Sequence, residues 1–192
     1  MQYIIPTLIF LINIIPTTHA GSVRILNRCP YAVELCSVGD TLSAYNTIQP
    51  NGAYTEETYL KAGGGGISIK LSRPDQGRSC TSSSDGIAQL EYTRNGPEGK
   101  IYYNLSHVDC VRTGNCPFMY DGIWLYTSAA PECRGFGCAP GVEECPAVYN
   151  IDDPRKLGLR APNIGCSHLE ASLYLDLCVT PPEDDCSGMG PL

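Results

Sequence analysis

Residues 87–105 read IAQLEYTRNGPEGKIYYNL, a pattern that is typical of a β-hairpin. The runs IAQLEYT and KIYYNL alternate apolar and polar side chains, and the NGP between them at positions 95–97 is a strong turn signal. Alternate residues of a strand point to opposite faces of a sheet. We therefore expect Tyr102 and Asn104 on one face, and Tyr103 on the other face, in the core.

Outward from this hairpin, the same period of two recurs in short segments bounded by turn residues. These predicted strands are residues 23–27, 31–38, 67–71, 122–127 and 169–178. No segment has the sustained apolar spacing of a helix, and the chain contains 20 Gly and 15 Pro. Between positions 110 and 166 Cys, Pro and Gly dominate. The sequence therefore predicts an all-β fold, a β-sandwich with disulfide-pinned loops.

The N-terminus has the pattern of a secretory signal peptide. Residues 4–15 are nearly all apolar, and Thr18-His19-Ala20 offers a small–x–small cleavage site. The alternative is an N-terminal membrane anchor, which the polar segment after the cleavage site disfavours. We expect a signal peptide at residues 1–20, one domain at 21–180 and an acidic, disordered tail at 181–192. The mature protein would be extracellular or associated with a cell wall, not with a membrane.

All 11 cysteines lie after the predicted cleavage site, which indicates a disulfide-stabilised protein from an oxidising compartment. No CxxC pair is present, and no histidine flanks the cysteines at zinc-ligand spacing. Because 11 is odd, at least one thiol is free or pairs with another molecule, so the protein is a monomer or a dimer through an unpaired cysteine. Cys186 in the tail is a candidate for that thiol.

Charge and motifs exclude several classes of function. The net charge is −7 and the pI about 4.9, with no basic stripe for a nucleic acid. The GGGG at positions 63–66 has no lysine of a phosphate-binding loop after it, and no G-x-S-x-G nucleophile motif occurs. A copper site built on His19 would need cleavage after Thr18, and the Ala20 site fits better. We expect no cofactor and no metal.

Three blocks of sequence resemble the thaumatin-like proteins. They are VRILNRCPYAV at 23–33, the hairpin segment at 88–109, and CRGFGC at 133–138 followed by CPA at 145–147. The resemblance implies a thaumatin-like β-sandwich. The helical second domain of that family has no counterpart between Cys145 and Cys166. The chain is therefore most similar to the short fungal branch, the antigenic thaumatin-like or yeast-phase-specific secreted proteins.

The family pattern also implies a set of disulfides. It pairs Cys29 with Cys178, Cys133 with Cys166 and Cys138 with Cys145. Cys110 and Cys116 are close enough in sequence for a local loop, but connectivity does not follow from spacing. Cys36, Cys80 and Cys186 stay unassigned.

The same resemblance places Glu91 on the family's cleft glutamate and Asp109 on one cleft aspartate. Asn104 stands where a second aspartate is expected, and an amide neither titrates nor attacks. Glycoside hydrolysis normally uses two carboxyl groups. Asn104-Leu105-Ser106 is also an N-glycosylation sequon, which predicts a glycan on Asn104 at this edge.

Aromatic side chains suggest a binding role instead. Tyr92 and Tyr102 lie beside Glu91, and Trp124 and Tyr126 alternate on a later strand. We predict a secreted, non-enzymatic protein that binds cell-wall glucan or host-surface components through Glu91, Tyr102 and Asp109. The alternatives are a weak endo-β-1,3-glucanase using Glu91 and Asp109, and a structural antigen or effector acting on a host protein.

Overall fold

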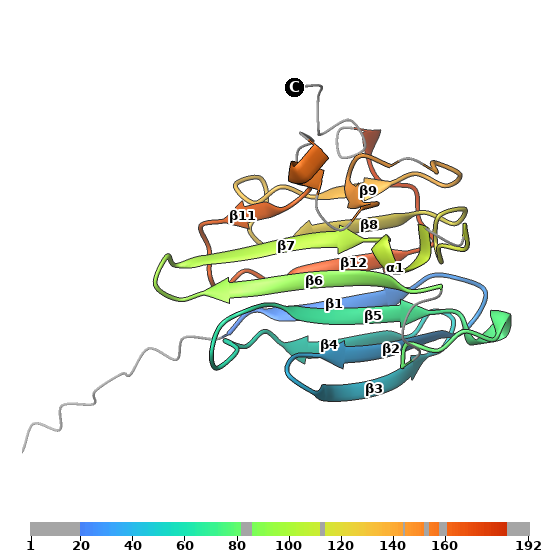
Figure 1. Cartoon of the computed structure of the whole chain (residues 1–192), viewed down its shortest axis with the longest axis horizontal. Coiled ribbons are helices and arrows are strands. Elements are labelled where there is room, and N and C mark those ends of the chain that lie inside the picture. The colour runs from blue at the N-terminus through green and yellow to red at the C-terminus, as the bar shows by residue number, and fades with distance from the viewer. Residues whose placement is uncertain are drawn as a thin grey trace, which may run out of the picture.

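The predicted hairpin forms the middle of one sheet of a β-sandwich (Figure 1). The computed structural model describes residues 20–81, 86–111, 114–143, 145–151, 154–157 and 161–183. In this part of the chain, strands β6 (Ala88–Asn95) and β7 (Lys100–Ser106) pair antiparallel around the NGP turn. The fold class is thus the one that the alternation predicts, and almost no helix accompanies the strands.

The other elements are short. The remaining strands are β1 (Ser22–Asn27), β2 (Val33–Val38), β3 (Leu42–Ile48), β4 (Ala53–Glu57), β5 (Ile67–Ser72), β8 (Ile123–Thr127), β9 (Phe136–Cys138), β10 (Val148–Tyr149), β11 (Ile164–Cys166) and β12 (Leu173–Leu177). The helical segments of the described residues are the 3-10 turns η1 (Pro74–Gln76) and η2 (Pro154–Leu157) and the single-turn helix α1 (Val108–Val111). The reduced helical part agrees with the short thaumatin-like pattern.

Two sheets face each other. The five-stranded sheet has the order β4-β1-β12-β8-β9, and the seven-stranded sheet has the order β10-β7-β6-β5-β2-β3, with β11 also paired to β7 (Figure 1). The two ends of the described chain meet in the first sheet, where β1 pairs parallel with β12. This pairing closes the sandwich.

The core lies between the sheets and is filled by the inward residues of each strand. On β6, Leu90 and Tyr92 are buried; on β7, Ile101, Tyr103 and Leu105 are buried. Tyr103 is therefore in the core, as the alternation predicts. Burial of such side chains supplies most of the stability of a sandwich, at roughly 25 cal/mol per Å² of apolar surface. The residues between them point outward, which determines what each outer face presents.

Disulfides close the loops around this core. All ten cysteines of the described residues are paired, as Cys29–Cys178, Cys36–Cys80, Cys110–Cys116, Cys133–Cys166 and Cys138–Cys145. Four of these pairs are those considered from the sequence, and Cys36–Cys80 is new. Cys186 lies outside the described residues, so its role in a dimer stays a prediction.

Some boundaries differ from the sequence expectation. The strands expected from residues 31 and 169 begin at Val33 and Leu173, because turns precede them. Strands β3 and β4 were not expected, and neither were the short strands β9, β10 and β11. β3 and β4 each lie at one edge of a sheet, and most of their residues are exposed, so they contain few of the buried apolar positions that reveal a strand in the sequence. Residues 1–19 and 184–192, which hold most of the predicted signal peptide and tail, lie outside the described part.

Candidate functional site

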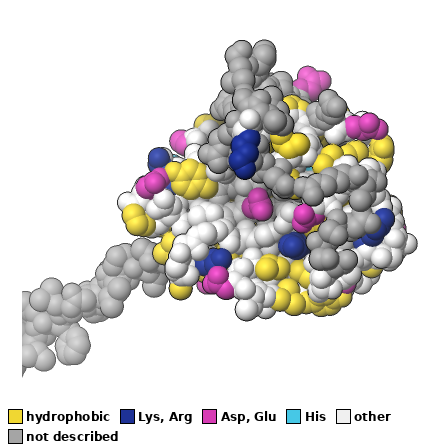
Figure 2. All heavy atoms as spheres, viewed as in Figure 1, with side chains coloured by type: hydrophobic (Ala, Val, Ile, Leu, Met, Phe, Trp, Pro, Cys, Tyr) yellow, Lys and Arg dark blue, Asp and Glu magenta, His cyan; other side chains and the backbone are white. Residues whose placement is uncertain are grey.

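A pocket opens on the outer face of the seven-stranded sheet, over the hairpin. Its volume is about 370 Å³, within the roughly 300–1,000 Å³ range of ligand sites. The lining residues come from four segments: Val38, Gly39, Gly66, Ile67, Ser68, Glu91, Tyr92, Thr93, Tyr102, Asn104 and Asn163. Figure 2 views this face and shows acidic side chains near its middle, with a basic side chain close by.

Strand register builds the centre of the pocket. Glu91 on β6 lies opposite Asn104 on β7, and on its other side it lies opposite Ser68 on β5. The neighbours Leu90 and Tyr92 point into the core, so alternation turns Glu91 outward. Three adjacent strands therefore deliver a carboxyl, an amide and a hydroxyl to one row of the sheet. The arrangement is rigid because each group is fixed by strand pairing.

The Glu91 carboxyl is partly withdrawn from water. Burial raises its pKa, and the negative charge of Asp109 raises it further, while a hydrogen bond from Asn104 and the charge of Lys70 oppose the shift. The net direction is upward. Glu91 therefore takes up a proton more readily than an exposed glutamate, a property shared by general acids of glycosidases.

Asn104 has an unused acceptor. Its amide engages Glu91, whereas its Oδ1 atom is buried and has no hydrogen-bond partner among the described residues. A buried carbonyl without a donor costs roughly 1–3 kcal/mol. Asn104 belongs to the pocket lining, so a turn of its side chain would present this acceptor to a ligand hydroxyl.

Tyr102 forms a wall of the pocket, as expected from its position on the strand. Its hydroxyl donates to Glu98 Oε2 at 2.5 Å, and this bond raises the pKa of Tyr102. On its other side, β11 passes close to the ring: a Cβ added to Gly165 would lie 2.8 Å from a ring carbon of Tyr102. The hydrogen bond and the glycine together fix where the ring lies.

Asp109 does not line the pocket with Glu91. It lies on α1, and its Oδ2 accepts from Gln89 Nε2 at 3.1 Å; Gln89 Oε1 in turn accepts from the Ser68 hydroxyl at 2.6 Å. A chain of hydrogen bonds therefore connects Asp109 to the floor of the pocket. The two carboxyl groups interact electrostatically, but only Glu91 is in the lining.

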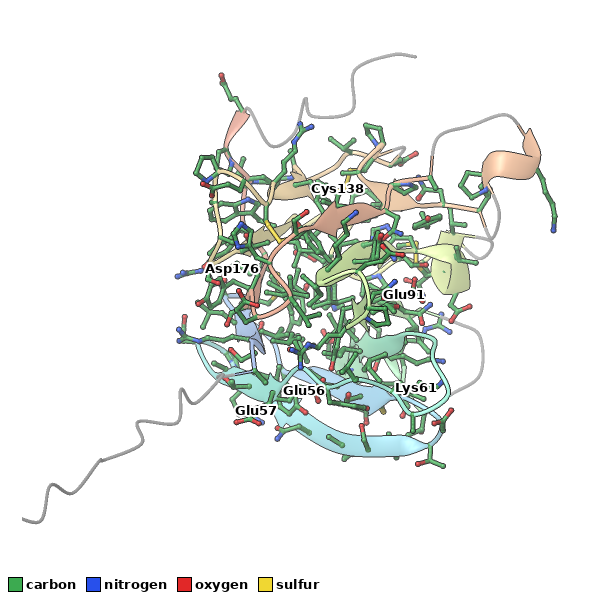
Figure 3. The ribbon with its side chains drawn as sticks, turned by 90° about the vertical axis from the view of Figure 1, so that its left-hand side faces the viewer. Glu56, Glu57, Lys61, Glu91, Cys138 and Asp176 are labelled. Atoms are coloured by element: carbon green, nitrogen blue, oxygen red, sulfur yellow. A yellow bond between two sulfur atoms is a disulfide. The ribbon has the colours of Figure 1, made fainter. Side chains whose placement is uncertain are left out.

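The aromatic residues singled out in the sequence lie in three different places: in the core, on the outer face of the seven-stranded sheet and on the outer face of the five-stranded sheet. Tyr92 is buried with Tyr103, and it reaches the pocket only as part of the lining next to Glu91. Trp124 and Tyr126 lie on β8 and point away from the core on the five-stranded sheet. Figure 3 shows that Glu91 and Asp176, the latter next to Trp124 in register, lie on opposite sides of the sandwich. Trp124 therefore has no part in the Glu91 pocket.

Sequence reasoning missed part of the pocket. Ser68, Gly66 and Asn163 belong to segments far from the hairpin in sequence. Ser68 alternates with buried Ile67 and Ile69, which was a usable signal for its outward direction. Asn163 lies at the site because β11 pairs antiparallel with β7, and no local sequence pattern predicts that pairing.

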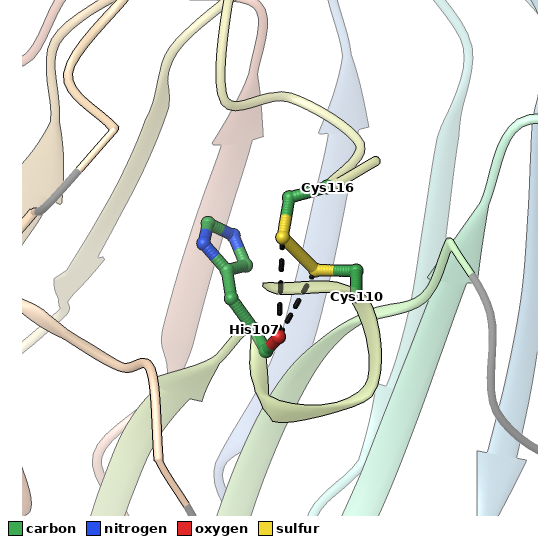
Figure 4. A group of neighbouring side chains, drawn as sticks. All are labelled: His107, Cys110 and Cys116. Carbon is green, nitrogen blue, oxygen red and sulfur yellow. Dashed lines mark hydrogen bonds between the residues drawn. A yellow bond between two sulfur atoms is a disulfide. The ribbon is translucent and has the colours of Figure 1, made fainter. Parts of the chain in front are cut away.

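A second cluster, His107, Cys110 and Cys116, has the residue types of a metal site (Figure 4). The two sulfur atoms are joined in a disulfide, so they offer no thiolate to a metal. They approach the His107 carbonyl oxygen at 3.1 Å and 3.9 Å, but as disulfide sulfurs they carry no hydrogen to donate. Burial lowers the pKa of His107 to about 4, and its Nε2 has no partner among the described residues. The cluster is a neutral, buried unit beside α1.

Comparison with solved structures agrees with this architecture. A protein elicitor from Magnaporthe oryzae is similar over 83% of this chain and all of its own, with a TM-score of 0.61 and 21% identity. A thaumatin-like xylanase inhibitor is similar over 82% of this chain and 99% of its own, with a TM-score of 0.52 and 12% identity. At such identities the likeness concerns the fold. The protein has the thaumatin-like fold.

The family follows from sequence. The profile of the Blastomyces yeast-phase-specific protein family matches residues 11–178, and the chain belongs to that family. It is 30% identical over 134 residues to an antigenic thaumatin-like protein of Arthroderma benhamiae, covering 69% of this chain and 60% of that one. It is 27% identical over 138 residues to a secreted thaumatin-like protein of Emericella nidulans, covering 72% of this chain and 74% of that one. The predicted resemblance is thereby confirmed.

Long apolar helices are missing from the part of the chain that the structure describes. None of its helical segments has the length and hydropathy needed to cross a bilayer.

Proposed function

We propose that this protein is a secreted, non-enzymatic binder of a neutral β-glucan, with the Glu91 pocket as its site. The observation that carries the proposal is the pair of acceptors in the pocket, the Glu91 carboxyl and the buried, unpartnered Oδ1 of Asn104. Sugar hydroxyls are donors, and Tyr102 provides an aromatic wall beside these acceptors. A neutral sugar suits the site because a negatively charged one would be repelled by Glu91 and Asp109.

Secretion is supported by three independent features. The N-terminal segment has the pattern of a signal peptide, the described cysteines are in disulfides, and a relative carries the description secreted. The site of action would be outside the cell or in a cell wall, where a glucan is accessible.

The absence of catalysis is argued from Asn104. Hydrolysis of a glycosidic bond needs one carboxyl as acid and a second as nucleophile or base, placed on opposite sides of the bond. In the described pocket lining Glu91 is the only carboxyl, and the amide of Asn104 lies directly opposite it. The descriptions of the two structural neighbours, an elicitor and an inhibitor, also name recognition rather than a reaction.

A weak endo-β-1,3-glucanase is the second candidate, and one observation favours it. Burial raises the pKa of Glu91, as a general acid requires, and Asp109 is close enough to influence it. In that case Glu91 would give its proton to the leaving oxygen, and the Asp109 carboxylate would act as the base that takes a proton from the attacking water.

Calorimetric titration with laminari-oligosaccharides, combined with a reducing-end assay, separates the two functions. We expect binding without release of reducing ends, and weaker binding by about tenfold for Asn104→Asp, because a second charge replaces the neutral acceptor. Ser106→Ala is the matched control, since it removes the same glycosylation sequon and leaves the Asn104 side chain in place. Release of reducing ends that Glu91→Gln abolishes would establish the enzyme instead.

Failure to bind at all would leave the third class, an antigen or effector that recognises a host protein. Glycosylation of Asn104 is part of the same test, because the glycan would sit at the pocket. Mobility of the secreted wild type before and after endoglycosidase treatment, with Ser106→Ala alongside, reports whether the glycan is there. Binding should be measured on the deglycosylated chain as well. This measurement distinguishes a pocket that the glycan blocks from a pocket that does not bind the glucan.

A further inference from the structure

A row of aromatic rings covers part of the other outer face of the sandwich. Trp124 and Tyr126 alternate along β8 with Ile123 and Leu125, which are buried, so both rings point away from the core. Tyr174 on β12 lies directly opposite Tyr126 in register. These three residues form an aromatic row on the five-stranded sheet.

The rings contact one another. The centroids of Trp124 and Tyr126 are 4.2 Å apart with an interplanar angle of 24°, and those of Tyr126 and Tyr174 are 5.2 Å apart with an angle of 34°. Contacts of this kind are worth about 0.5–1.5 kcal/mol each beyond buried area. Because the rings order one another, a ligand that uses them loses little side-chain entropy on binding.

A groove of about 420 Å³ runs along this row, between Trp124 and Tyr126 on one side and the segment around Pro131 and Arg134 on the other. The segment is held in place at several points. Thr127 Oγ1 donates to the Cys133 carbonyl at 3.0 Å, the Tyr103 hydroxyl donates to the Arg134 carbonyl at 2.7 Å, and Cys133 is joined to Cys166. The groove is therefore a preformed feature of the fold.

Its charge is opposite to that of the molecule. The chain has a net charge of −7, yet Arg134 is the only charged side chain among the described lining residues. Arg134 is exposed, and no ion pair connects its guanidinium to another described residue. By contrast Arg28, on the same face, is paired with Asp176 at 3.0 Å. A basic group in an aromatic groove selects a ligand with a flat apolar face and a negative charge.

We propose that this groove binds a uronic acid residue of an acidic polysaccharide. The apolar face of the sugar ring lies against Trp124, and its carboxylate pairs with the guanidinium of Arg134. Arginine binds carboxylates with two parallel hydrogen bonds, which gives geometric specificity as well as affinity. A neutral sugar would leave Arg134 unused. The proposal is independent of the Glu91 pocket, which lies on the opposite side of the sandwich.

The chain has one tryptophan, so its emission, excited selectively, reports on the groove alone. The test titrates the full chain with oligogalacturonate and, separately, with laminari-oligosaccharide of equal length. We expect a saturable change of Trp124 emission with oligogalacturonate only, weakened by added salt. Arg134→Gln should lower the affinity by about tenfold or more while the melting temperature stays unchanged. Lys100→Gln, which removes a positive charge from β7 in the other sheet, is the matched control and should bind as the wild type does.

The remaining outcomes overturn the proposal. Silent Trp124 emission with both sugars would show that the groove binds neither. Equal changes with both sugars, or an Arg134→Gln variant of unchanged affinity, would show that charge plays no part in selection. Oligogalacturonate binding that Glu91→Gln weakens and Arg134→Gln does not would assign the acidic sugar to the other pocket. If laminari-oligosaccharide does not bind at the Glu91 pocket, the proposed glucan function is contradicted, and the proposal for the groove is not affected.

Discussion

On the seven-stranded sheet the functional groups come from strands paired in register, whereas on the five-stranded sheet they come from one strand and a disulfide-held loop. Glu91 and Asn104 face each other across the hairpin, and the pocket around them is acidic. Trp124 and Arg134 meet across a groove whose only described charge is positive. One sandwich therefore presents two surfaces of opposite charge, each fixed by a different kind of constraint.

This difference shows how a small fold separates two recognition tasks. Polar groups placed by strand register tolerate little movement, since a shift of one residue would turn Glu91 into the core. The groove depends instead on cross-links and on the aromatic row. Substitutions that loosen the loop should act on the groove first, and substitutions that change charge on β6 should act on the pocket alone.

The Cys133–Cys166 disulfide gives the largest expected effect, because it joins the wall of the groove to β11 beside Tyr102. It closes a loop with a sequence separation of 33, so replacing both cysteines by serine should lower the free energy of unfolding by about 4 kcal/mol. Binding at the groove, whose lining includes Cys133, should weaken first, and binding at the pocket should weaken to a smaller extent. Chemical denaturation and the two titrations measure this, and a loss confined to one ligand would show that the two surfaces are not linked.

His107 should make the pocket side of the molecule sensitive to acid. Its pKa falls from 6.5 to about 4 on burial, so between these values the unfolded chain binds a proton that the folded protein refuses. The free energy of unfolding keeps its full His107 contribution above pH 6.5 and loses it as the pH falls toward 4. The loss is about 3 kcal/mol at most, at 1.36 kcal/mol per pKa unit.

His107→Leu should remove this part of the pH dependence. Urea denaturation at neutral and at mildly acidic pH gives the two free energies for each protein, and the other titrating groups cancel in the difference between wild type and variant. Equal losses in the two proteins would mean that His107 is protonated in the folded state.

Glu91→Gln should stabilise the protein at neutral pH, because burial raises the pKa of Glu91 and thus penalises its ionised form. The gain should vanish as the pH falls below about 4, where the glutamate of the unfolded chain is also neutral. Melting temperatures across this range test the prediction, with Glu57→Gln as an exposed control on β4. A variant that melts lower than the wild type at neutral pH would show that the hydrogen bond from Asn104 outweighs burial.

The smallest expected effect belongs to Gly165→Ala. The added Cβ would lie 2.8–3.1 Å from the ring of Tyr102, which must swing away from its place in the pocket. Because the ring is the end of a flexible side chain, the loss of stability should be below about 1 kcal/mol. Glucan affinity should fall by less than about tenfold, while groove binding stays unchanged. Gly96→Ala in the turn between β6 and β7, whose Cβ would make an ordinary 3.6 Å contact with Leu60, should leave both affinities as they are.

Much of the fold could be predicted from local sequence patterns. The alternation in residues 87–105 predicts the hairpin, its turn and the core position of Tyr103, because these depend on near neighbours. Strands β3 and β4 escaped prediction because exposed edge strands contain few of the buried apolar positions that reveal a strand. The pairing of Cys36 with Cys80 also lay beyond reach, since the loop that carries Cys80 is positioned by the Glu34 carboxylate, which accepts from its backbone nitrogen at 2.6 Å.

The residues of the site also fall into those that local sequence predicts and those that depend on distant pairing. Glu91, Tyr102 and Asn104 could be placed together from one hairpin, and the structure does so. Asn163 and the aromatic groove could not, because they depend on β11 reaching β7 and on a loop held by a disulfide from position 133 to 166. Asp109 was expected in the pocket, but the short helix α1, which no periodicity announces, places it behind Gln89.

The account depends most on the claim that the Glu91 pocket binds a neutral glucan and does not cleave it. Amide chemical-shift mapping with a laminari-oligosaccharide tests both parts in one sample, since the length of the sugar can be followed through its anomeric protons in proton spectra of that sample. We predict saturable shifts at Glu91, Tyr102 and Asn104 and a sugar of unchanged length. Shifts confined to the groove of Trp124 and Arg134, or progressive shortening of the sugar, would contradict the account.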